Sequence, residues 1–149
     1  MPNAPLPLKL FPALYKTYDV AQGTANLEAL WASEAVLSQD GVLGIFSEGR
    51  LHAPPLNQAL PGAAFLALRT GAPILPVGIY NEDAWDIFGT IKREKRRMRA
   101  ICHFGKVFGP LTCDHARRPD RETICTAGER IMSEIALLLP EETRNEFPG

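Results

Sequence analysis

The chain has 149 residues, of which 46% are hydrophobic and 22% are charged, and its formal net charge is −1. This length supports one domain that buries roughly two thirds of the surface of the unfolded chain, so a core can form without disulfides or metals. The near-neutral charge excludes a general attraction to nucleic acid, and attraction to a charged partner must therefore be local.

The three cysteines form no CxxC pair, and no histidine lies at zinc-ligand spacing beside them. We therefore predict neither a metal site nor a disulfide framework, and we predict no cofactor. A reducing, cytoplasmic setting is expected. Residues 1–16 are apolar, but four prolines interrupt them, and no apolar run approaches the roughly 20 residues that a transmembrane helix needs.

The spacing of apolar residues predicts strands alternating with helices. The expected elements are a strand over 16–20, a helix capped by Thr24, a strand over 42–46, a helix over 62–70, and strands over 73–79 and 100–105. A closing amphipathic helix is expected from about Asp120 to Leu139, ended by Pro140. This order predicts a single α/β domain over residues 1–149, with a mixed, mostly parallel sheet flanked by helices.

A polar segment follows the predicted strand over 42–46, and in α/β sheets ligands bind outside the carboxyl ends of the strands. Gly49 would let the backbone approach a ligand, Arg50 could hold a phosphate through two parallel hydrogen bonds, and Glu48 could fix the loop. A solvated loop with a Glu/Arg pair is the alternative. The candidate substrate-binding residues are Ser47, Glu48, Gly49, Arg50 and His52. Ser47 is not predicted to be a nucleophile, because Ile45 stands where a G-x-S-x-G turn needs its first glycine.

Several blocks of the sequence resemble the glycerophospholipid acyltransferase family, the lysophosphatidate acyltransferase-like proteins. The matching blocks, in chain order, are residues 18–23, Phe46-Ser47-Glu48-Gly49, and residues 61–68, 72–79, 104–110 and 135–140. The resemblance implies transfer of an acyl chain from acyl-CoA or acyl carrier protein to a glycerol phosphate or lysophospholipid acceptor. It also implies an acyltransferase-like fold that is incomplete at its N-terminus.

The family's catalytic His-x4-Asp pair precedes the second block, and this chain lacks it there, so no catalytic residue is assigned. His115 and Asp120 have that spacing but follow the fourth block, where Asp120 is better explained as a helix cap. Departures at Ala21, Gln22 and Leu51 remove two arginines that the family uses for phosphate. Two hypotheses stay open: an acyltransferase domain that is inactive as this chain, or a non-catalytic lipid- or partner-binding module.

A basic run occurs at Lys92, Arg93, Lys95, Arg96 and Arg97. It could contact anionic headgroups at the inner face of the membrane, or it could be a solvated loop. No nucleic-acid role is predicted, because no aromatic residue interleaves the run. Exposed apolar surface is expected to promote self-association.

Overall fold

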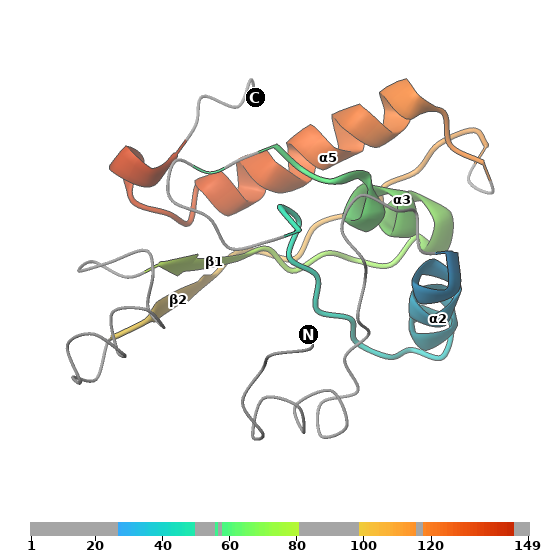
Figure 1. Cartoon of the computed structure of the whole chain (residues 1–149), viewed down its shortest axis with the longest axis horizontal. Helices are drawn as coiled ribbons and strands as arrows, with labels where there is room; N and C mark the ends of the chain where they lie inside the picture. Colours follow the sequence, from blue (N-terminus) through green and yellow to red (C-terminus); the bar gives the residue numbers. More distant parts are fainter. Residues whose placement is uncertain (1–26, 50–55, 57, 81–98, 116–117, 145–149) are drawn as a thin grey trace, which may run out of the picture.

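The structure is a computed structural model, and it describes residues 27–49, 56, 58–80, 99–115 and 118–144. These ranges contain three α-helices, a two-stranded antiparallel sheet and a short 3-10 helix (Figure 1). In chain order the elements are α2 (Leu27–Leu37), α3 (Pro61–Thr70), β1 (Val77–Tyr80), β2 (Ile101–Phe104), α5 (Arg121–Ala136) and η1 (Glu141–Thr143). The predicted α/β class is confirmed.

Helix α5 is the element against which the others are arranged. It contacts both α3 and β1, whereas α2 contacts α3 (Figure 1). Its buried residues follow the helical repeat, so one face of the helix is covered from Ala127 to its C-terminal end. These residues are Ala127, Gly128, Ile131, Met132 and Ala136. The predicted closing helix is therefore confirmed, and its apolar spacing was the correct signal.

The core consists of two clusters along α5. One lies toward its C-terminus around Met132, which is fully buried, and the other lies where Ala127 and Ile131 meet Ala64 and Leu68 of α3. The half-buried Ile135 packs against both clusters. Burial of each large apolar side chain contributes roughly 1.5–3 kcal/mol, so this helix–helix contact is a main source of stability for the described residues.

The two strands pair with Val77 opposite Phe104, and an isolated bridge joins Ile74 to Phe108. Two residues, 75 and 76, lie between these positions on one chain segment, whereas three, 105 to 107, lie between them on the other. The extra residue is a β-bulge. Because of it, Phe108 turns inward with Ile74 to contact the core cluster around Ala64, while Val107 stays on the opposite side, where it is exposed.

The hairpin has two unlike faces because successive side chains of a strand alternate. On the inner face, a Cβ atom added at Gly78 would lie 2.9 Å from the Cβ atom of Leu138, so the segment after α5 covers this face closely. On the opposite side six apolar side chains gather, and most are exposed. We call this side the outer face; it comprises Leu75, Val77, Ile79, Cys102, Phe104 and Val107.

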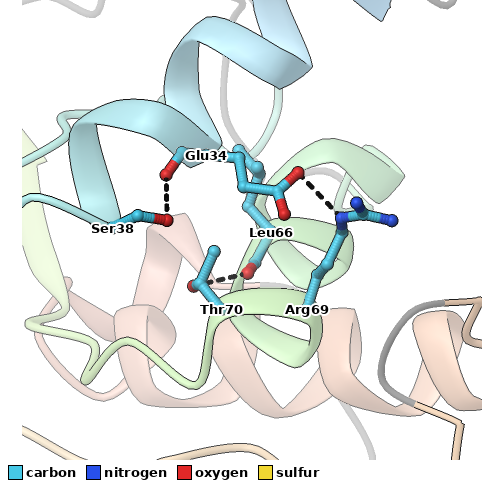
Figure 2. A network of polar contacts seen from close by, with 5 residues as sticks. All are labelled: Glu34, Ser38, Leu66, Arg69 and Thr70. Carbon is cyan, nitrogen blue, oxygen red and sulfur yellow. Dashed lines mark hydrogen bonds and ion pairs between the residues drawn. The ribbon is translucent and has the colours of Figure 1, made fainter.

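Polar contacts join α2 to α3 (Figure 2). The Arg69 Nε atom lies 2.8 Å from the Glu34 Oε2 atom, and both side chains are partly buried. The Thr70 hydroxyl donates to the carbonyl of Leu66 and accepts from the N–H of Ala72, which secures the end of α3. No residue of α2 is buried, so this ion pair helps to fix a helix that has little apolar attachment.

One sequence prediction about the sheet is wrong. Residues 41–46 form no strand, and Val42 in this segment is 95% exposed. A strand needs a hydrogen-bonded neighbour, and within the described ranges only β1 and β2 pair as strands. That sheet is antiparallel, so the described part of the chain contains no parallel pair. The predicted strand over 16–20 and the predicted cap Thr24 lie outside the described residues.

The other elements agree with the sequence. The helix predicted over 62–70 is α3, and the strands predicted over 73–79 and 100–105 contain β1 and β2 in shorter form. Among the described helices, none is both long and apolar enough to cross a membrane.

We predict that Met132→Ala lowers the free energy of unfolding by about 2–5 kcal/mol, because the substitution leaves a cavity between α5 and the residues around it. Leu137→Ala, at the exposed C-cap position five residues further along, is the control and should change this free energy by under about 0.5 kcal/mol. Urea unfolding followed by circular dichroism measures both. Equal effects of the two substitutions would show that Met132 does not occupy the core.

Candidate functional site

The turn at residues 46–49 is held in place by backbone hydrogen bonds. The N–H of Gly49 donates to the carbonyl of Phe46 at 2.9 Å, and the N–H of Leu60 donates to the carbonyl of Ser47 at 2.7 Å. Ser47 is buried, and Gly49 has a φ angle of 71°, in the left-handed region that favours glycine. The second bond ties the turn to the residue immediately before α3.

The beginning of α3 offers backbone donors next to this turn. Its N-cap residue is Leu60, whose side chain makes no capping hydrogen bond, and Pro61 follows. The first turn of α3 contains no acidic residue, so the partial positive charge of the helix N-terminus is not neutralised within the helix. A Cβ atom added at Gly62 would meet nothing within 4 Å, so space is open beside this turn of the helix.

The predicted site residues are placed in part. Ser47, Glu48 and Gly49 lie together in the turn and close to the start of α3. Arg50 and His52 lie outside the described residues, as does the basic run from Lys92 to Arg97. The sequence analysis missed the start of α3 as a source of N–H donors. The available signal was Pro61, because proline is frequent at the first position of a helix.

His103, the polar side chain of β2, has structural partners. The Nδ1 atom of His103 lies 3.0 Å from the carbonyl oxygen of Leu138, and its ring meets the ring of Tyr80 edge-on at 5.5 Å. A carbonyl oxygen only accepts, so Nδ1 must carry the proton. His103 therefore links β2 to the segment after α5. The described residues contain no group of three or more side chains that could hold a metal ion.

Asp120 is the N-cap of α5, as the sequence predicted. Its carboxylate accepts from the Thr123 backbone N–H at 2.8 Å and from the Thr123 hydroxyl at 2.9 Å. These two hydrogen bonds, the backbone one first, lower the pKa of Asp120 below its ordinary value. A carboxylate engaged in this way caps a helix, so its spacing from His115 needs no catalytic explanation.

Comparison with known proteins gives one match of limited extent. The chain is 29% identical over 100 residues to the UDP-N-acetylmuramoyl-L-alanyl-D-glutamate--2,6-diaminopimelate ligase of Vibrio vulnificus (strain YJ016). The matched region covers 64% of this chain and 19% of the ligase. The chain therefore spans about a fifth of the length of the curated relative that it matches. No family model matches the chain, and no solved structure matches it.

This comparison overturns the acyltransferase prediction. The curated match is a ligase and not an acyltransferase, so the predicted family, the acyl-transfer function and the role in phospholipid synthesis are wrong. The predicted acyl donors and lipid acceptors depended on the same resemblance and have no other support. The residues on which the acyltransferase resemblance rested are explained by the local structure. Gly49 meets a backbone requirement of the turn, and Pro61 begins a helix. Such short glycine and proline patterns recur wherever strands, turns and helices alternate.

We predict that Gly49→Ala lowers the free energy of unfolding by about 1–3 kcal/mol, because a non-glycine residue at this φ angle is strained. The new Cβ atom would also come within 2.2 Å of the Leu60 Cδ1 atom, so the leucine side chain must move. Gly44→Ala is the matched control, since its Cβ atom would meet nothing within 4 Å. Urea unfolding compares the two variants, and equal stability would contradict the described geometry of the turn.

The lowered pKa of Asp120 predicts a pH dependence. Because the folded-state pKa lies below the unfolded one, the carboxylate stabilises the fold above the ordinary pKa of aspartate, and this contribution is lost as the pH falls through the lower, folded value. Asp120→Asn keeps a capping acceptor and removes the titration, whereas Asp120→Ala removes both. The stability advantage of the wild type over Asp120→Ala should shrink on acidification. Thermal unfolding between neutral pH and pH 3 tests this, and an advantage independent of pH would contradict it.

Proposed function

We propose that this chain is a ligand-binding part of a ligase-like protein that acts on a UDP-N-acetylmuramoyl-peptide. The observation that carries the proposal is the identity of 29% over 100 residues with a ligase whose name specifies UDP-N-acetylmuramoyl-L-alanyl-D-glutamate and 2,6-diaminopimelate. The chain corresponds to about a fifth of that ligase, so the proposal concerns binding and not the complete reaction.

The chemistry of such a ligand defines what the chain must supply. A UDP group carries a diphosphate, and the glutamate of the peptide adds carboxylates, so the ligand is strongly anionic. Proteins bind such groups through backbone N–H donors at helix N-termini and through arginine side chains. The N–H groups of residues 62 and 63 at the start of α3 are donors of this kind, and Arg50 directly follows the neighbouring turn at 46–49 in the sequence.

Within the proposal, the residues have separate roles. The N–H groups of the first turn of α3 and the guanidinium of Arg50 contact the anionic group of the ligand. Gly49 supplies the left-handed backbone conformation that the turn requires, and Glu48 shapes the loop. The mixed, mostly parallel sheet predicted from the sequence is part of this proposal. In it, further strands would extend the sheet that β1 and β2 form.

We predict that the chain binds UDP-N-acetylmuramoyl-L-alanyl-D-glutamate and that Arg50→Ala weakens binding on the order of tenfold or more, because a charge-assisted pair of hydrogen bonds is lost. Arg50→Lys should lie between the two, since lysine keeps the charge but not the planar fork. Isothermal titration at two salt concentrations measures this, and affinity should fall as salt rises. Arg118→Ala, at an exposed arginine just before α5, is the control.

A second pair of variants tests the start of α3. Leu60→Asp places a carboxylate at the N-cap, which should raise stability and compete with the ligand for the same N–H groups. Leu60→Asn caps without a charge and should reduce affinity less. If the wild type does not bind the UDP-linked peptide at millimolar concentration, or if Arg50→Ala and Leu60→Asp bind as the wild type does, the proposal is wrong.

A further inference from the structure

Within the described part of the chain, no residue buries the outer face of the hairpin, although its inner face is tightly packed. Four side chains of the outer face are large and well exposed: Phe104 at 69%, Val107 at 62%, Ile79 at 51% and Leu75 at 49%. Cys102 is also exposed, and Val77 is half-buried. In the pairing, Phe104 lies opposite Val77 and Cys102 lies opposite Ile79, so these side chains are neighbours on one surface.

The composition of this surface results from the bulge. Without the extra residue, Phe108 would point outward and Val107 inward; with it, Phe108 joins the core, and Val107 extends the outer face. A two-stranded ribbon is marginal in water unless packing supports it. Here the segment after α5 supports only the inner face, so a hydrophobic contact on the outer face would add stability.

The area of the outer face indicates what kind of partner would cover it. An aromatic side chain such as that of Phe104 can bury about 150–250 Å², and the five smaller side chains bury less each, so the exposed parts of these six residues together amount to something on the order of 500 Å². A standard interface buries about 800 Å² on each partner, with an apolar centre and a polar rim. The outer face is therefore the size of an interface centre, and polar residues around it would complete the contact.

We propose that the outer face docks against the same face of a second copy of this chain, with a twofold axis between them. None of the six residues that define the face is charged, so contact among them buries no unpaired charge. The net charge of −1 adds little repulsion between two copies. An isologous contact also covers both exposed faces with one interface, as in most symmetric dimers. This inference does not depend on the ligand proposed above.

The first test is the oligomeric state of the full chain. Sedimentation velocity should show a dimer at about 10–100 µM, the range expected for a small apolar interface. Phe104→Lys should raise the dimer dissociation constant at least tenfold, because it places an unpaired charge in the interface. Trp31→Lys is the control, since Trp31 is 62% exposed but lies on α2. A monomer at every concentration, or equal loss of dimer in both variants, overturns the proposal.

A second test uses a cysteine of the outer face and needs no disruptive substitution. In a Cys113→Ala, Cys125→Ala variant, only Cys102 can react with a bismaleimide. The strand rise and the spacing of stacked sheets place two Cys102 thiols within roughly 20 Å in the proposed dimer. A variant that keeps only Cys125, an exposed residue of α5, is the control. Cross-linked dimer should form through Cys102 and not Cys125; equal yields, or no product from Cys102, would contradict the twofold contact.

Discussion

The contact that α5 makes with α3 and the hairpin is the constraint on which the described structure depends. Met132, fully buried, lies toward one end of this contact, and Ala127 and Ile131 continue it along the helix. The closing segment of the chain therefore organises elements that precede it in sequence. Without this helix, α3 would lose its apolar partner, and a two-stranded ribbon alone would be marginal.

The second constraint is the distribution of side chains between the two faces of the hairpin. Because side chains of a strand alternate, every second one would face the inner side of the hairpin. Beyond Phe104 the bulge reverses which side chains face inward and which face outward. The core thereby gains Phe108, over whose ring the guanidinium of Arg130 lies at 5.9 Å. The exposed apolar outer face is therefore a direct consequence of how the core is built, and it is not a random scatter of surface residues.

The sequence predicted the helices well and the sheet poorly, for a physical reason. A helix closes its hydrogen bonds within one segment, so the apolar repeat of α5 and its Asp120 cap are visible locally. A strand depends on a partner elsewhere in the chain, and the apolar run over 42–46 gives no information about one. The residues 47–49 were correctly expected to leave that run as a polar loop. Their position beside α3 could not be predicted, because it results from the hydrogen bond between Leu60 and Ser47.

The two ends of α3 have different environments, and this difference bears on the proposed site. At the C-terminal end, Arg69 is paired with Glu34 and so attaches α3 to α2 (Figure 2). Thr70 is hydrogen-bonded to Leu66 and Ala72 and so attaches α3 to the loop that follows. At the N-terminal end, Leu60 provides no side-chain cap, and space beside Gly62 is open. A helix anchored at one end can present its other end without losing its position. The packing of α3 on α5 thus explains how uncapped donors can be held in a fixed place beside the turn at 46–49.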